Sequence, residues 1–122
     1  PITKVITDNI YHRAYTGHSL VNEAENGIVD TTRVWWVQAE AVVGFLNGWQ
    51  RDPGHPEYLE AAEDIWGYIK EYVVDHRQGS EWFWAVDENG KPLEKPIVEP
   101  WKCPYHNGRM CMEVIRRIQN VA

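Results

Sequence analysis

The chain has 122 residues, 43% of them hydrophobic, which is enough for one small domain with a modest core. Its formal net charge of −6 at pH 7 argues against nucleic-acid and membrane partners, because nucleic acids and anionic lipid surfaces select basic faces. No apolar run is long enough to cross a bilayer, no basic-then-apolar leader is expected and two cysteines are too few for a disulfide framework, so we expect a cytoplasmic protein.

The first half of the chain predicts two helices joined by a loop. Helix is expected over residues 1–15, followed by a loop that includes the polar residues 22–26. A second, longer helix is expected over residues 33–50, with Thr31 or Thr32 as its N-cap. Its side chains form two adjacent, mainly apolar stripes, which indicates packing on several sides; the stripes are Trp35, Ala39, Val42, Leu46 and Trp49, and Trp36, Glu40 and Val43.

The second half begins with a third helix, and an extended segment follows it. Pro56 suits the first turn of this helix, which fades near Asp75. The aromatic residues 81–86 and the following Asn89-Gly90 predict a small hairpin or extended excursion. Residues 91–100 contain three prolines and are expected to form a loop.

The start of the last predicted helix carries the first candidate site. This helix is expected from about Pro104 to Gln119, so His106 lies in its first turn, where the helix dipole disfavours a protonated imidazole. A neutral histidine can take or give a proton near pH 7, and Trp101 on the incoming loop can present a flat face to a sugar ring. The alternative is a plain helix start with a surface histidine. Further along, the side chains expected to face inward are Met110, Cys111, Val114, Ile115 and Ile118.

The second candidate site lies on the long helix. Trp36 and Glu40 are four residues apart and share one helix face. Because the neighbours of Glu40 in the sequence are apolar, its carboxylate needs a partner or a polar cavity. Glu40 is therefore either a sugar-binding group beside a stacking tryptophan or a structural carboxylate paired with an arginine or a backbone N–H, and the sequence leaves both open.

The other candidate sites are weaker. Each of the remaining histidines is interpreted as solvated or structural; they are His12, His18, His55 and His76. Cys103, His106 and Cys111 supply only half of a zinc-type pattern, so no metal site is expected. The sequence has no glycine-rich phosphate loop and no Gly-x-Ser-x-Gly elbow, and no cofactor is expected.

Three motifs, in one order along the chain, resemble those of the sugar 2-epimerases of the N-acylglucosamine/cellobiose 2-epimerase family. They are Trp35-Trp36-Val37-Gln38-Ala39-Glu40, Glu81-Trp82-Phe83-Trp84, and Trp101-Lys102-Cys103-Pro104-Tyr105-His106-Asn107 followed by Arg109. The resemblance extends over most of the chain and is clearest from Asp30 onward. The residues of the last motif are more similar to those of the cellobiose 2-epimerase branch than to those of the N-acylglucosamine branch.

This resemblance implies an all-α fold, with residues 1–122 forming a single C-terminal portion of an (α/α)6 barrel: about four helices with a short β-hairpin excursion. It implies inversion at C2 of a reducing-end sugar, cellobiose or a related glucose or mannose derivative, through a cis-enediolate and without metal or nucleotide. By motif match, His106 resembles one of two acid/base histidines. Trp36, Trp101 and Glu40 resemble pocket residues, with Trp35 as the alternative to Trp36 as the tryptophan that faces the sugar.

The resemblance also implies that the chain is about a third of such an enzyme, with the second catalytic histidine outside it. We expect little activity from the chain alone, since both proton transfers need positioned groups. We also expect self-association, because the absent helices would cover apolar faces. Two alternatives remain: another carbohydrate enzyme on the same barrel, such as a glycoside hydrolase, or a non-catalytic helical module that binds sugar or protein.

Overall fold

The computed structural model describes residues 1–120 and contains four α-helices and two small antiparallel sheets. The helices are α1 (Ile2–Arg13), α2 (Trp35–Arg51), α3 (Pro56–Tyr68) and α4 (Tyr105–Gln119), and α3 continues into a π-helical turn, Ile69–Val73. The strands are β1 (Glu23–Glu25), β2 (Ile28–Asp30), β3 (Arg33–Val34) and β4 (Ala85–Val86). The four helices thus lie close to where the sequence predicts them.

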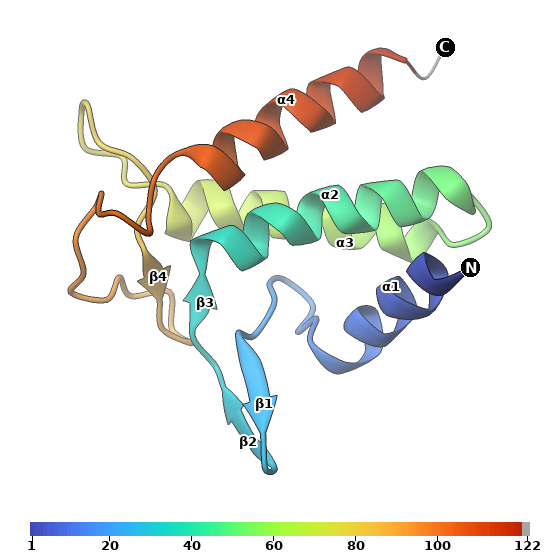
Figure 1. Ribbon diagram of the computed structural model, residues 1–122, viewed down its shortest axis with the longest axis horizontal. Helices are drawn as coiled ribbons and strands as arrows, with labels where there is room; N and C mark the ends of the chain where they lie inside the picture. Colours follow the sequence, from blue (N-terminus) through green and yellow to red (C-terminus); the bar gives the residue numbers. More distant parts are fainter. Residues whose placement is uncertain (121–122) are drawn as a thin grey trace.

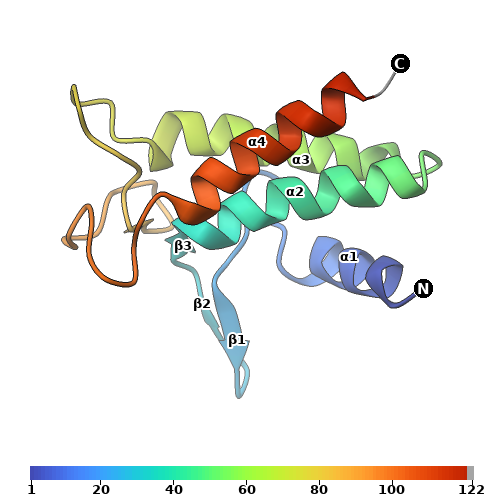
Figure 2. The ribbon, with the colours of Figure 1, turned by 45° about the horizontal axis from the view of Figure 1, so that its top comes forward.

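The helices form an open arrangement centred on α2. Helices α2 and α3 run side by side, α4 crosses above them, and α1 lies on the opposite side of α2 (Figure 1). The β1–β2 hairpin projects away from the helices in both views (Figures 1 and 2), while β3 and β4 lie where α2 begins (Figure 1). In the part of the chain described, no helix is long and apolar enough to span a membrane.

The core lies at the interface between α2 and α3. Helix α2 buries residues on several sides, as its two stripes predict, and Pro56 occupies the first turn of α3. The fully buried contacts include Ala39, Ile65 and Ile69. Helix α1, by contrast, buries none of its residues completely, so its apolar side chains Ile2 and Val5 stay exposed.

The predicted N-cap of α2 is wrong. Neither Thr31 nor Thr32 caps the helix, because the chain runs directly from strand β3 into α2 and Val34 holds the N-cap position in an extended conformation. The first helical N–H, that of Trp35, donates instead to the carbonyl of Trp84, 3.1 Å away. The backbone carbonyl of Trp84, which directly precedes β4, therefore satisfies an N–H at the start of the helix, where a threonine cap is predicted from the sequence.

Residues 22–26 were expected to be a loop, but they enter a hairpin. Strand β1 pairs with β2 through a turn at Asn26 and Gly27, whose φ angles are +51° and +77°. Two successive positive φ angles are the requirement of a type I′ turn, which Asn-Gly meets at low steric cost. The Asn26-Gly27 dipeptide is the sequence pattern that predicts this turn. The polar composition of residues 22–26 favoured the interpretation as a loop instead.

The aromatic excursion at residues 81–86 is extended, as expected, but its main partner is distant in sequence. Strand β4 pairs with β3, placing Ala85 opposite Val34 and Val86 opposite Arg33. Val86 also forms an isolated bridge with Pro92 across the turn at residues 87–91. This pairing fixes the start of α2 against the excursion.

The inward face predicted for α4 is only partly correct. Met110 is buried, but Cys111, Ile115 and Ile118 are exposed, the last two at 55% and 62%. These four side chains nevertheless share one side of α4, as predicted, because all of them line an apolar groove of about 630 Å³ between α4, α2 and α3. Nothing in residues 1–120 fills that groove.

Gly90 lies in the turn after the aromatic excursion and packs closely against the ring of Tyr72. Its φ is +80°, and a Cβ there would lie 2.5 Å from the ring of Tyr72. Gly79 has a similar φ of +76° but open space around it, so it is a matched control for backbone strain. We expect Gly90→Ala to lower the free energy of unfolding by about 1–3 kcal/mol more than Gly79→Ala does, measured by urea titration. Equal losses would show that the Tyr72 contact does not constrain this turn.

A polar cluster ties the end of α4 to α2. Arg116 and Arg117 both donate to the carboxylate of Glu113, and the contact with Arg116 is the main reason that the pKa of Glu113 falls to about 2. Arg117 Nη1 also donates to Asn47 Oδ1 (3.1 Å) and Gln50 Oε1 (3.0 Å) on α2. The ionised form of Glu113 is therefore the one that holds this cluster together.

The stability of the fold should depend on pH through this carboxylate. A depressed pKa stabilises the folded state above the ordinary value of 4.5, and this contribution disappears as pH falls from there to about 2. Glu113→Gln should flatten the fall in melting temperature across that window, whereas Glu23→Gln on the exposed hairpin should leave the slope unchanged. Identical slopes for all three proteins would contradict a stabilising role for the ionised Glu113.

Candidate functional site

The candidate site forms where the first turn of α4 faces the first half of α2. His106 lies in the first turn of α4, as the sequence predicts, because Pro104 holds the N-cap position and the helix begins at Tyr105. The imidazole is 34% exposed and its Nδ1 lies 3.0 Å from Oε1 of Glu40 on α2. The two predicted polar residues, 66 positions apart, therefore meet.

Glu40 joins α4 at two points. While Oε1 contacts His106, Oε2 accepts a hydrogen bond of 2.7 Å from Nη2 of Arg109. His106 and Arg109 are three residues apart and so project from the same side of α4. Of the two alternatives left open for Glu40, the structure confirms the arginine partner. The role of Glu40 in sugar binding, beside the half-exposed Trp36, stays a prediction.

This contact fixes the tautomer of His106. An ionised carboxylate only accepts hydrogen bonds, so Nδ1 must carry the proton in the contact with Glu40. In a neutral imidazole the other ring nitrogen, Nε2, is then unprotonated and can act as a base. The arrangement resembles the general design in which a carboxylate orients a histidine so that its second nitrogen is ready for proton transfer.

The two adjacent tryptophans of α2 have different surroundings. Trp36 is 43% exposed and its ring centroid lies 5.7 Å from that of His106, so it has a free face beside the imidazole. Trp35 is 97% buried, packed between Trp84 and His106. The ring of Trp35 therefore has no face open to a sugar, and we expect it to support His106 by packing. Trp36 remains the candidate residue for stacking on a sugar.

Trp101 lies on the loop that leads into α4 and is 87% exposed. Among residues 1–120, no aromatic contact joins its ring to Trp36 or His106. A tryptophan this exposed is unusual in a monomeric surface, and it is free to contact a ligand or another part of a larger protein.

Sequence reasoning missed Arg109 as a site residue, although it lies in the quoted motif. Its spacing of three from His106 was the available signal, since an arginine at that position shares the histidine's helix face. It also missed the buried group formed by Glu81, Lys102 and Asn107, whose side chains meet directly behind the site.

The other histidines have structural partners away from the site. His12 lies 3.3 Å from Asp8, and His76 lies 2.7 Å from a backbone carbonyl. His18 contacts the Ser19 hydroxyl, and His55 contacts Glu57. Within the described residues, no group of three or more His, Cys, Asp or Glu side chains is placed to hold a metal ion.

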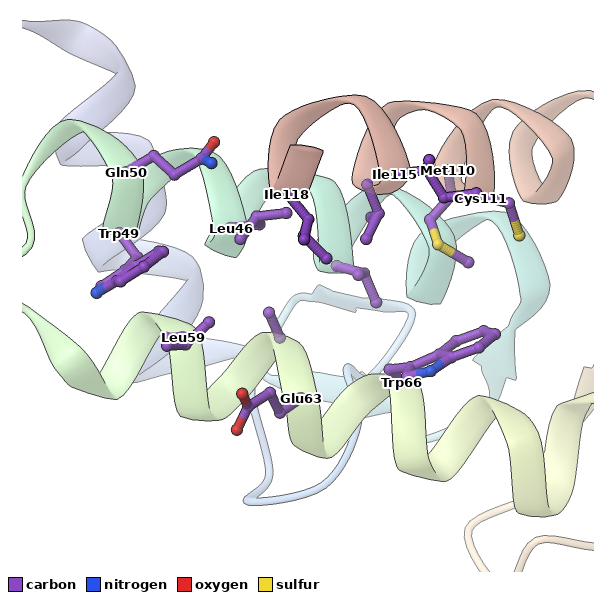
Figure 3. Close-up of a pocket in the computed structure, with 13 residues that line it drawn as sticks. Leu46, Trp49, Gln50, Leu59, Glu63, Trp66, Met110, Cys111, Ile115 and Ile118 are labelled. Carbon is purple, nitrogen blue, oxygen red and sulfur yellow. The ribbon is translucent and has the colours of Figure 1, made fainter. Parts of the chain in front are cut away.

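The apolar groove is separate from this polar site. Figure 3 shows Trp66 and Leu59 of α3 facing Ile115 and Ile118 of α4 across it, with Leu46 of α2 at its floor. Its lining is almost wholly apolar, and Glu63 and Gln50 stand at the edges as the polar members. The groove thus lacks the convergent polar groups that position a sugar.

The sequence of this chain matches a known protein family and several of its members. The family model described as N-acylglucosamine 2-epimerase (GlcNAc 2-epimerase) matches residues 4–108. The cellobiose 2-epimerase of Eubacterium cellulosolvens is 50% identical over 116 residues, and that of Dictyoglomus turgidum is 51% identical over 113 residues. These matches cover 95% and 93% of this chain but 28% and 29% of the two relatives.

The fold agrees with this similarity. The structure of cellobiose 2-epimerase from Bacillus thermoamylovorans superposes with a TM-score of 0.90 and 47% identity, covering 93% of this chain and 29% of that one. The four helices and two small sheets match part of an (α/α)6 barrel. The chain therefore spans somewhat less than a third of the length of the relatives that it matches.

Proposed function

The chain belongs to the N-acylglucosamine 2-epimerase family, and we propose that it supplies part of the active site of a carbohydrate 2-epimerase. The proposed substrate is cellobiose or a related sugar with glucose or mannose at its reducing end, because the relatives are cellobiose 2-epimerases. The observation that carries the proposal is the contact of His106 Nδ1 with Glu40, which leaves Nε2 as a base beside Trp36.

In the proposed reaction His106 moves the proton on C2. With the sugar ring open, Nε2 takes the C2 proton, the C2–H electron pair forms a double bond to C1, and the C1 carbonyl becomes the oxyanion of a cis-enediolate. A second group then delivers a proton to the opposite face of C2, which inverts that centre. In the reverse direction His106 returns the proton that it holds.

Glu40 orients the base in this scheme. It holds the Nδ1–H tautomer and stabilises the imidazolium that forms when Nε2 accepts a proton, while Arg109 fixes the carboxylate itself. Because both oxygens of Glu40 are already engaged, it is poorly suited to act as one of the two opposed carboxylates of a glycoside hydrolase. This pairing favours proton transfer over the hydrolase alternative.

The second acid/base group is proposed to lie in the part of the relatives' barrel that this chain does not span. None of the other four histidines in the described residues shares the site, and the relatives are more than three times as long. We therefore propose that the chain alone turns over no sugar. A cytoplasmic location is also proposed, since both cysteines are free thiols.

The test uses a completed enzyme: the Dictyoglomus turgidum relative with its matching segment replaced by this chain, called the chimera below. In D2O the chimera should exchange the C2 hydrogen of cellobiose and form the C2 epimer, followed by NMR. His106→Asn should lower kcat by about 10²–10⁴-fold, the range for loss of a general acid/base. Glu40→Gln should lower it by about 10–100-fold, as expected for a group that orients the base.

His12→Asn is the matched control, because His12 is a surface histidine of α1. It should leave kcat unchanged. Full activity of His106→Asn would exclude the proposed role of His106. Sugar binding without C2 exchange in an otherwise folded chimera would favour a non-catalytic binding module, and turnover by the 122-residue chain alone would contradict the proposed need for a second group.

The apolar groove suggests a partner for the isolated chain. The exposed Ile115 and Ile118, with Trp66 across the groove, form a continuous apolar surface (Figure 3). In the relatives the remainder of a much longer chain is available to cover such a surface, and this chain spans only 29% of that length. We propose that a second copy of the chain occupies the groove when it is produced alone.

Sedimentation equilibrium tests this proposal. The unmodified chain should form a dimer or larger species as its concentration rises, and Ile115→Glu/Ile118→Glu should remain monomeric, because two charges would be buried in the contact. Ile28→Glu, on the exposed hairpin, should self-associate like the unmodified chain. A monomer at every concentration for the unmodified chain would exclude the groove as a site of self-association.

A further inference from the structure

Directly behind the candidate site lies a buried ammonium group. Lys102 is completely buried, although it is flanked by the exposed Trp101 and Cys103. Its Nζ donates to a carboxylate oxygen of Glu81 and, at 2.8 Å, to the carbonyl oxygen of Ile97. A buried lysine is rare unless it is paired. These two contacts are the partners that allow the ammonium group of Lys102 to be buried.

Glu81 joins this lysine to the start of α4. Its other carboxylate oxygen accepts a hydrogen bond from Nδ2 of Asn107, which is 93% buried and follows His106 directly. One carboxylate therefore holds Lys102 and Asn107, the residues on either side of the segment 103–106. The segment is pinned at both ends to the aromatic excursion.

The same lysine also lies beneath the tryptophan that supports the imidazole. Nζ of Lys102 is 5.5 Å from the centre of the Trp35 ring, and the Trp35 ring is 6.4 Å from that of His106. Because Lys102 points inward, the preceding Trp101 is left on the surface with 87% exposure. The buried ion pair thus lies next to two of the residues expected to meet the sugar, Trp101 and, through Trp35, His106.

We propose that Glu81 is a positioning residue: through Lys102 and Asn107 it holds the first turn of α4 so that His106 Nδ1 stays against Glu40. This proposal rests on the proposed function only for its kinetic consequence. Glu40 fixes the imidazole at the tip of its side chain, and Glu81 fixes the backbone from which it projects. Both constraints are needed, because an error of about 1 Å in a catalytic group can cost about 100-fold in rate.

The geometric claim is tested in the 122-residue chain by ¹⁵N NMR of the histidine rings. The His106 signals are assigned by their loss in His106→Asn. The unmodified chain should show His106 as one neutral tautomer, protonated at Nδ1, and Glu81→Gln should show a mixture of the two tautomers. Glu94→Gln changes an exposed carboxylate in the loop of residues 91–100; it is the matched control and should behave like the unmodified chain. An unchanged His106 spectrum in Glu81→Gln would overturn the proposal.

The kinetic consequence is tested in the chimera, at a temperature where circular dichroism shows each variant to be folded. Glu81→Gln should lower kcat by about 10–100-fold with KM nearly unchanged, because the proton-transfer geometry is lost and sugar binding is kept. Glu81→Gln/Asn107→Asp returns one carboxylate to the group and keeps one amide, so it should recover much of the lost kcat. A kcat that stays at the unmodified value in Glu81→Gln, or a double variant no better than Glu81→Gln, would contradict the positioning role.

These measurements separate the two proposals. An unmodified chimera without C2 exchange would count against the proposed function, while the NMR result would still decide whether Glu81 positions His106. An active chimera whose Glu81→Gln variant keeps its kcat would leave the epimerase proposal standing and remove the positioning role.

Discussion

The structure depends on one carboxylate that joins two helices which are distant in sequence. Glu40 on α2 engages His106 and Arg109 on α4, so the orientation of the imidazole and the approach of the helices are set by the same contact. Helix α4 otherwise leaves much of its apolar face uncovered, and its far end is held by the Glu113 and Arg117 cluster. Polar contacts at both ends therefore keep α4 in place over a groove that is not filled.

The elements that the sequence predicts well are those with strong periodic patterns. The α2 stripe that begins at Trp35, Pro56 at the start of α3 and the start of α4 just before His106 all follow from local rules, and the structure confirms them. In the second α2 stripe only Val43 is buried, and Trp36 is 43% exposed. The β1–β2 hairpin was missed although Asn26-Gly27 carried its signal. The resemblance supplied the barrel and the chemistry, which periodicity alone does not provide.

The features that escaped sequence reasoning depend on partners far along the chain. The N-terminus of α2 is satisfied by the carbonyl of Trp84, so a correct local rule for threonine caps led to a wrong prediction. Buried polar groups are a second case: Gln38 belongs to neither apolar stripe of α2, yet it is completely buried and forms paired hydrogen bonds with the backbone of Leu20. Lys102 likewise lies between the exposed Trp101 and Cys103, and its buried ammonium group is satisfied by Glu81 and the carbonyl of Ile97.

The central claim is that Glu40 holds His106 so that Nε2 meets the C2 carbon of an open-chain sugar. The most direct measurement is a crystal structure of the chimera with cellobiitol, the open-chain alcohol of cellobiose. The account predicts His106 Nδ1 within hydrogen-bond distance of Glu40 and Nε2 about 3–3.5 Å from C2. A sugar bound with C2 away from Nε2, or an imidazole turned away from Glu40, would contradict it.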